Sequence, residues 1–360
     1  MNESYQPGIE TLCVHFAENR GLHHGAANPP LYQTSTFTFP DCASFVARLE
    51  NHQGFDYTRV GNPTTRLLEQ KIAALEKGEA ARAFGSGMAA ISAAILSCVK
   101  SGDHVVCIET VYGPTRRLLT DYLPRFGIET TYVRGLEVAD FEAATRPNTK
   151  LYYVESPSSL LFEVQDLKAV AALAKSKGIT TICDNSNATP VFQNPFALGI
   201  DLVVHSATKY IGGHSDVVAG LVVGSADRLR SITNLEGELL GGVADPFASW
   251  LLLRGLRTLG VRMERHARNT AAIARLLEKR PDCPRALSDQ FARPDVLRRA
   301  LKKLGVSIDL QQRTKAESDL AVAAASILAR ERFIDWMDKT SKAGGVELPL
   351  GASDAVIDAA

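Results

Sequence analysis

The pattern of apolar and polar positions divides the chain into an irregular start and a regular middle. Residues 1–62 show no sustained period, and stretches such as GAANPPLYQTSTFTF are rich in Gly, Pro, Thr and aromatic residues. The apolar spacing then becomes helical in TTRLLEQKIAALEKGE and in GMAAISAAILSCVKSG, where Gly102 should end the second helix. We therefore expect an arm that carries contacts, followed by a folded domain.

Short apolar runs alternate with helical patterns along the next hundred residues. The runs predict strands at 103–109, 130–134, 151–156, 180–185 and 201–207, with helices at 114–127 and 167–178. The strands are apolar throughout and do not alternate with a period of two. This combination indicates an α/β fold around a mostly parallel sheet. Residues 246–279 predict one long helix, or two helices joined at a glycine.

The pattern changes again near residue 280. RPDCPRALSDQFARPD is rich in turn formers, RRALKKLG predicts a basic helix, SIDLQQRT a strand, and ESDLAVAAASILARERFIDWMDK an amphipathic helix. We therefore expect three parts: an N-terminal arm at 1–62, a central domain at 63–283 and a C-terminal part at 284–360.

Composition narrows the class of protein. A chain of 360 residues with 45% hydrophobic content can bury a large core. Its 40 basic and 40 acidic residues cancel, so the charge favours neither nucleic acid nor an anionic membrane as a partner. The N-terminus shows no basic and then apolar leader, and the apolar stretches are shorter than a membrane span. The six cysteines are scattered without metal-ligand spacing, so we expect a cytoplasmic protein with reduced core thiols.

Candidate chemistry gathers where predicted strands end. In DLVVHSATKYIGGHSDVVAG, Lys209 follows an apolar run; Asp184 follows TTIC, Tyr112 follows HVVCIET, and Glu155 ends LYYVE. Ligands of open parallel sheets bind beyond the carboxyl ends of the strands. The turn GSGM opens a helix nearby, and the free N–H groups of a helix start can hold an anion.

These groups suit an aromatic aldehyde phosphate. A lysine amine can form an imine with the aldehyde, and burial of Lys209 would lower its pKa toward the reactive free base. Asp184 would keep a pyridine nitrogen protonated, which makes the ring an electron sink, and Tyr112 could stack on the ring. The phosphate would be held by the hydroxyls of Ser206 and Thr208 and the amides of Gly87 and Met88.

Each of these residues also has a plainer explanation on its own. A lone lysine at a strand end is usually solvated, and a lone aspartate there is usually a turn or cap residue. Cys183 reads as core, and His205 and His214 as structural histidines. Only the expected gathering of Lys209 and its neighbours at one edge of the sheet favours a cofactor site.

The chain also resembles a known family. The resemblance lies in YTRVGNPTTRLLEQKIAALE, AFGSGMAAISA, GDHVVCIETVYGPT, VESPSSLLFEVQDL, CDNSNATPVFQNPFALGIDLVVHSATKYIGGHSDVVAG and LLRGLRTLGVRMERHARN. These motifs look like those of the Cys/Met-metabolism family of pyridoxal-phosphate enzymes, from about residue 11 to residue 279. ESPSSLLFEVQD, where relatives more often carry ESP-x-NP, resembles the cystathionine β-lyase branch most.

This resemblance implies a fold and a set of roles. The fold would be the large domain of the pyridoxal-phosphate-dependent transferases, of the aspartate aminotransferase type. Lys209 would hold pyridoxal 5'-phosphate and move protons, Asp184 would pair with its ring nitrogen, and Tyr112 would stack on the ring and help the leaving group depart. Tyr57 and Arg59 resemble the pair that reaches the phosphate of a neighbouring subunit. We therefore expect a homo-oligomer, a dimer or tetramer, with shared active sites.

The implied reaction is carbon–sulfur cleavage of a small amino-acid substrate. In the cystathionine β-lyase branch it yields homocysteine, pyruvate and ammonia, within methionine and transsulfuration metabolism. Family members continue into a smaller domain that supplies a serine and an arginine for the substrate carboxylate, and no matching motif follows residue 280. The resemblance thus implies a lyase that the missing clamp impairs, or a protein that binds the cofactor without turnover.

The tail resembles a different family. Residues 285–356 look like the C-terminal part of ribonuclease HIII, in which four carboxylates bind two metal ions. Asp289 and Glu317 match two of these carboxylates, and no segment resembles the strand that carries the others. We expect a ribonuclease H-like α/β fragment with vestigial carboxylates and no metal, and Asp289 and Glu317 as a turn residue and a helix-start charge. Hydrolysis of an RNA–DNA hybrid is the remaining alternative.

Overall fold

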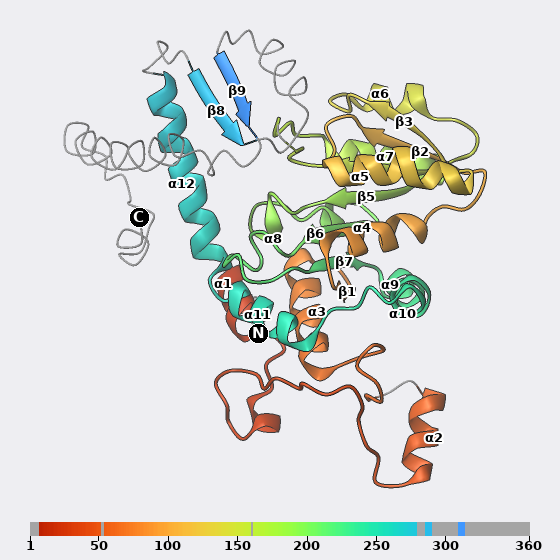
Figure 1. The fold of residues 1–360 in the computed structure, drawn as a ribbon, viewed down its shortest axis with the longest axis vertical. Helices are drawn as coiled ribbons and strands as arrows, with labels where there is room; N and C mark the ends of the chain where they lie inside the picture. The colour runs from red at the N-terminus through yellow and green to blue at the C-terminus, as the bar shows by residue number, and fades with distance from the viewer. Residues whose placement is uncertain (1–6, 52–53, 160, 279–284, 290–308, 314–360) are drawn as a thin grey trace, which may run out of the picture. The chain divides into compact units, whose positions relative to one another are not determined.

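A computed structural model describes residues 7–51, 54–159, 161–278, 285–289 and 309–313 (Figure 1). The chain forms two compact units, residues 1–260 and residues 261–360. The first unit holds the sheet and every residue expected to contact the cofactor. The expected domain boundary, between residues 283 and 284, lies outside the described part of the chain. The three-part division therefore stays a prediction.

A seven-stranded sheet forms the centre of the first unit, in the order β1-β7-β6-β5-β4-β2-β3. Strand β7 is antiparallel to both of its neighbours, and all other neighbouring pairs are parallel. The expectation of an α/β fold with a mostly parallel sheet is therefore confirmed. The strands are β1 Ala80–Phe84, β2 His104–Ile108, β3 Glu129–Val133, β4 Thr149–Glu155, β5 Thr180–Asp184, β6 Leu202–Ser206 and β7 Gly220–Gly224.

Helices connect these strands, and those near the site contact the sheet directly. Helix α3 contacts β1, α4 contacts β6 and β7, and α7 contacts β5. The helices of this unit are α1 Ile9–His15, α2 Cys42–Asn51, α3 Pro63–Glu76, α4 Gly87–Leu96, α5 Gly113–Arg117, α6 Val138–Ala144, α7 Leu167–Ser176, α8 Thr189–Phe192, α9 Ala226–Ile232, α10 Glu238–Leu240 and α11 Pro246–Leu256.

The start of α3 shows why its sequence forms a helix there. The side chain of Asn62 accepts the N–H of Thr64 at 2.9 Å, and Pro63 occupies the first turn, where its missing N–H costs nothing. The helix ends where Lys77 adopts a left-handed conformation with φ of 60°. The prediction of a helix over this segment is confirmed.

Two predicted helices differ from the observed ones. The second ends at Leu96 and does not reach Gly102, because the backbone turns at Ser97 and Cys98. The predicted helix at 114–127 is α5, followed by a π-helical turn over Leu118–Tyr122 and a 3-10 turn over Leu123–Phe126. Pro124 lacks the N–H that a regular helix needs at this point, and the ladder loosens one turn before it.

The sequence analysis also missed two strands and misplaced the junction between two helices. The sequence pattern did not predict β1, where the charged Arg82 interrupts the apolar run, or β7, whose short run is bounded by glycines. The long segment after residue 245 forms two helices, α11 and α12 (Leu259–Glu278). They join at Arg257 and Thr258 and not at a glycine, since Gly255 lies inside α11 and Gly260 inside α12.

The arm is more structured than its sequence suggested. It contains α1, a 3-10 turn over Arg20–His23, and α2. Lys71 of α3 anchors it: the fully buried ammonium donates to the carbonyls of Cys13 and Val14 and pairs with Glu18 at 2.7 Å. A charge buried in this way needs such partners, and they fix the arm to the domain.

The second unit is described only in part. Its two described strands, β8 Arg285–Asp289 and β9 Asp309–Arg313, pair in parallel. β9 lies in the segment that predicted a strand, whereas β8 lies in one that predicted turns. Asp289 is the last residue of β8 and pairs with Arg313, so the expectation that it is a turn residue is wrong. Glu317 lies outside the described residues, and the ribonuclease-like character of the tail stays a prediction. Within the described residues, no helix has the length and apolarity to cross a membrane.

Candidate active site

The carboxyl ends of neighbouring strands bring the expected residues together. Ser206, Asp184 and Glu155 are the last residues of β6, β5 and β4, which are adjacent in the sheet. Glu155 and Asp184 face each other in the register of β4 and β5. Tyr112 begins α5 just beyond the end of β2, the next strand along. The sequence-based expectation that these groups share one edge is confirmed.

The first turn of α4 offers backbone donors at this edge. Ser86 caps the helix by accepting the N–H of Ala89 at 3.0 Å. The N–H groups of Gly87 and Met88 have no hydrogen bond within the described residues, as expected for the start of a helix. A Cβ on Gly87 would lie 2.9 Å from the Ser206 Oγ, so only glycine allows this close approach.

Two hydroxyls follow on β6 and the turn after it. Ser206 is half-buried beside Gly87, and its N–H donates to the Ser186 hydroxyl at 2.6 Å. Thr208 bonds to the main chain of Ala219, donating to its carbonyl at 3.2 Å and accepting its N–H at 3.1 Å. The Ser206 hydroxyl thus borders the helix start, whereas a phosphate bond from Thr208 requires its hydroxyl to turn away from Ala219.

Asp184 is a buried carboxyl at the centre of the edge, with 5% of its surface exposed. Burial raises its pKa, and hydrogen bonds from Ser186 oppose that rise. One carboxyl oxygen accepts the Ser186 N–H at 2.9 Å. A cation placed against Asp184 would therefore favour the ionised carboxylate, which burial alone disfavours.

Lys209 departs from the expectation in one respect. It lies in the turn after β6, held by main-chain bonds from its N–H to Ser206 and from Gly213 to its carbonyl. Its side chain is exposed, so the expectation of a buried, unsolvated amine is wrong for the isolated chain. The apolar run that suggested burial ends at β6, and the turn carries the side chain out of the sheet.

Tyr112 is anchored by a residue to which sequence reasoning gave no role. Its N–H donates to Glu155 Oε2 at 2.7 Å, and the Ser159 hydroxyl donates to Glu155 Oε1 at 2.5 Å. Glu155 is only 4% exposed. Burial and the neighbouring charge of Asp184 raise the pKa of Glu155 to about 8. Its place at the end of LYYVE was the one sequence signal for it.

A second buried acid supports the edge from within. Glu76, at the end of α3, accepts hydrogen bonds from Asn185 and from His205 Nε2, both at 2.7 Å. Glu76 and His205 are fully buried, and the positive charge of a protonated His205 lowers the pKa of Asp184. The structural interpretation of His205 is confirmed, and Cys183 is likewise a buried core residue.

The arm pair stands apart from this group. Arg59 lies over the ring of Tyr57, with its guanidinium carbon 5.3 Å from the ring centroid, and donates to the Glu238 carbonyl at 3.0 Å. Both side chains are exposed. Within the described residues neither of them has a hydrogen bond to Lys209 or Asp184. Their expected role toward a neighbouring subunit therefore stays a prediction.

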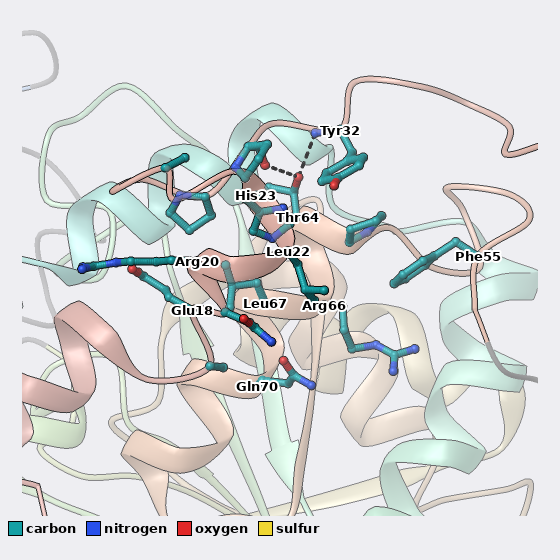
Figure 2. A pocket seen from close by; sticks show the side chains of 16 residues that line it. Glu18, Arg20, Leu22, His23, Tyr32, Phe55, Thr64, Arg66, Leu67 and Gln70 are labelled. Carbon is teal, nitrogen blue, oxygen red and sulfur yellow. Dashed lines mark hydrogen bonds between the residues drawn. The ribbon is translucent and has the colours of Figure 1, made fainter.

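A separate cavity of about 340 Å³ lies between the arm and α3 (Figure 2). The Thr64 hydroxyl ties its rim together, accepting the Tyr32 N–H at 3.0 Å and donating to the Pro30 carbonyl at 3.2 Å. Polar side chains such as Glu18 and Gln70 line it beside prolines and leucines. None of the residues expected to hold a cofactor lines this cavity.

The groups at the sheet edge fit pyridoxal phosphate. The glycine at the start of α4 leaves room that a Cβ would fill, and the free N–H groups there suit a phosphate. The buried Asp184 suits a protonated ring nitrogen. The exposed Lys209 amine is free to reach an aldehyde, and the ring of Tyr112, 41% exposed, is free to stack.

Comparison with known proteins agrees with this geometry. Residues 10–318 match the family described as Cys/Met metabolism PLP-dependent enzyme. The match extends to residue 318, although the sequence analysis found no family motif after residue 280.

Similar proteins include lyases of more than one specificity. The chain is 45% identical to cystathionine gamma-lyase of Bacillus subtilis (strain 168), over 76% of this chain and 70% of that protein. It is 45% identical to L-methionine gamma-lyase of Porphyromonas gingivalis, over 73% of this chain and 68% of that protein. It is 43% identical to cystathionine beta-lyase MetC of Staphylococcus haemolyticus, over 75% of this chain and 67% of that protein. The crystal structure of metB from Corynebacterium glutamicum matches with a TM-score of 0.73 and 39% identity, over 77% of this chain and 70% of that one.

Proposed function

Because the chain belongs to the Cys/Met metabolism PLP-dependent enzyme family, whose cofactor is pyridoxal 5'-phosphate, we propose that it breaks the Cβ–S bond of cystathionine. The products would be homocysteine, pyruvate and ammonia. The observation that carries this proposal is the shared edge: Asp184 ends β5, Tyr112 follows β2, and Ser206, just before Lys209 in the chain, lies against Gly87 at the start of α4. The motif ESPSSLLFEVQD supports β-cleavage over γ-cleavage, since it resembles the β-lyase branch.

Each residue at the edge has a definite task in this reaction. The bound cofactor supplies an electron sink that stabilises negative charge at the substrate Cα. The Gly87 and Met88 amides and the Ser206 hydroxyl hold the phosphate. Asp184 holds the proton on the ring nitrogen, and its burial strengthens that interaction.

Proton movement falls to Lys209 and Tyr112. Lys209 would hold the cofactor aldehyde at rest and be freed when the substrate amine takes its place, and its free amine would then take the proton from the substrate Cα and deliver it to the departing sulfur. The Tyr112 phenol assists the leaving group; Tyr112 follows β2, whereas Lys209 follows β6. The Cα proton thus ends on the thiol, and water converts the remaining fragment into pyruvate and ammonia. We propose that a homo-oligomer completes the site, with Tyr57 and Arg59 reaching the phosphate of a neighbouring copy.

An absorption spectrum tests cofactor binding. The purified protein should show a band near ~420 nm, typical of a lysine-bound pyridoxal phosphate, and borohydride should bleach it. Lys209→Ala should lose the borohydride-reducible band. Lys175→Ala, a change of an exposed lysine on α7, should keep it. A reducible band in the Lys209 variant would show that another lysine holds the cofactor.

The identity of the keto acid tests the reaction. Cleavage of cystathionine at Cβ yields pyruvate, whereas cleavage at Cγ yields 2-oxobutanoate. We expect pyruvate from cystathionine in the holoenzyme, and none from Lys209→Ala. Release of 2-oxobutanoate would replace the β-lyase assignment with a γ-lyase one. A bound cofactor without either product would identify a protein that binds pyridoxal phosphate without turnover.

A further inference from the structure

Glu155 connects three pieces of the sheet edge. It ends β4, faces Asp184 on β5 in the strand register, and accepts hydrogen bonds from Tyr112 and Ser159. The two bonds reach different elements, the turn after β2 and the loop after β4. A single carboxyl therefore joins that turn and that loop beside the ring-nitrogen site.

The anchoring matters most for Tyr112. Tyr112 is 41% exposed, and no hydrogen bond of its phenol occurs within the described residues. The turn that precedes α5 sets the direction of the Tyr112 ring, and that turn is tied to β4 by the 2.7 Å bond from the Tyr112 N–H to Glu155. Small displacements of a reacting group can lower a rate many-fold, so the tie bears on catalysis.

Ser159 in turn fixes Glu155. Its hydroxyl donates to the second carboxyl oxygen at 2.5 Å, which leaves Glu155 with both oxygens engaged. With 4% of Glu155 exposed, water has little access to replace either bond. The chain of contacts thus runs from Ser159 through Glu155 to the main chain of Tyr112.

We propose that Glu155 is a positioning residue for the lyase reaction, acting through Tyr112 and held in place by Ser159. This rests on the proposed function, in which the Tyr112 phenol assists the leaving group. The carboxyl needs only to accept the Tyr112 N–H. Glutamine can do the same with its amide oxygen, whereas alanine leaves that N–H unpaired.

Substitution kinetics on the holoenzyme test the role. At pH 7.5, Glu155→Ala should lower kcat for pyruvate release by on the order of 10- to 100-fold, with KM changed by less than about 3-fold. Glu155→Gln should restore kcat to within about 5-fold of the unmodified enzyme. Glu142→Gln, which removes an exposed carboxylate on α6, should leave kcat unchanged. An equal loss in the Gln and Ala variants would overturn the proposal.

A double-mutant cycle with Tyr112→Phe separates positioning from general destabilisation. The phenylalanine variant lacks the phenol, so Glu155→Ala should cost less than about 3-fold in that background. Losses that multiply in full would show that Glu155 does not act through Tyr112. If Glu155→Ala folds poorly, Ser159→Ala can replace it in the cycle, since it removes only the hydrogen bond that fixes Glu155. Absence of the ~420 nm band from the unmodified protein would instead disprove the proposed function itself.

Discussion

Replacing Glu155 with glutamine should change how the stability of the cofactor-free protein depends on pH. Burial and the charge of Asp184 raise the pKa of Glu155 to about 8 from its ordinary 4.5. Between these two values the folded chain keeps a proton that the unfolded chain releases. The free energy of unfolding of the unmodified protein therefore falls as pH rises through this window.

The size of the effect follows from the two pKa values. At about 1.36 kcal/mol per pH unit, the interval from 4.5 to about 8 corresponds to about 5 kcal/mol. Asp184 shares the same buried space and takes up part of this cost, so we expect roughly 2–5 kcal/mol. Glutamine has no proton to release and still accepts the Tyr112 N–H. Glu155→Gln should thus match the unmodified protein near pH 4.5 and exceed it in stability at pH 8.5.

Thermal unfolding at a series of pH values measures this difference. A gain of this size corresponds to a difference in Tm of about 4–10 °C at pH 8.5. The difference should shrink steadily as the pH is lowered to 5. Glu142→Gln provides the control, since this exposed carboxylate should give no trend with pH. An equal Tm difference at pH 5 and pH 8.5 would refute the assignment of a raised pKa to Glu155.

Other predictions follow from particular contacts. Gly87→Ala places a Cβ against β6, and we expect cofactor affinity, measured by titration of the ~420 nm band, to fall about 5- to 100-fold. Glu76→Ala leaves His205 buried without its partner, which should lower the free energy of unfolding by about 3–5 kcal/mol in urea titrations. Mixing inactive Arg59→Ala and Lys209→Ala proteins should restore some pyruvate release if neighbouring copies share sites, whereas continued inactivity would contradict sharing.

The sequence predicted the sheet edge well because strand ends are visible in it. Each of the runs TTIC, LYYV and LVVH is an apolar strand followed by a polar residue, and in a parallel sheet these ends align. The pattern could not show that Glu155 pairs with Asp184, because register depends on how β4 and β5 align in space. Nor could it show that Tyr112 is held by its main chain, since hydrogen bonds of the backbone leave no mark on residue type.

Elements with a mixed pattern were the ones that sequence reasoning missed. β1 carries Arg82, whose guanidinium donates to the carbonyls of Val60 and Arg59 at 3.1 and 2.9 Å, so the charge that interrupts the apolar run is buried in the arm contact. Long-range bonds of this kind hold the arm to the domain, and such bonds leave no periodic pattern in the sequence. For Lys209 the error was the reverse: the sequence predicted a buried residue and the structure has an exposed one. An apolar run that forms a strand does not bury the turn that follows it.

Burial separates the charges of the edge into two groups. Asp184 and Glu155 lie in a region with little water, where two neighbouring anions repel strongly, whereas Lys209 lies on the exposed side. A protonated ring nitrogen against Asp184 would stabilise one of these anions and favour the proton on the other. In that state Glu155 would be neutral, and its unprotonated oxygen would still accept the Tyr112 N–H. A protonated ring nitrogen would thus set which of the two adjacent carboxyls holds the shared proton, while either form of Glu155 still accepts the Tyr112 N–H.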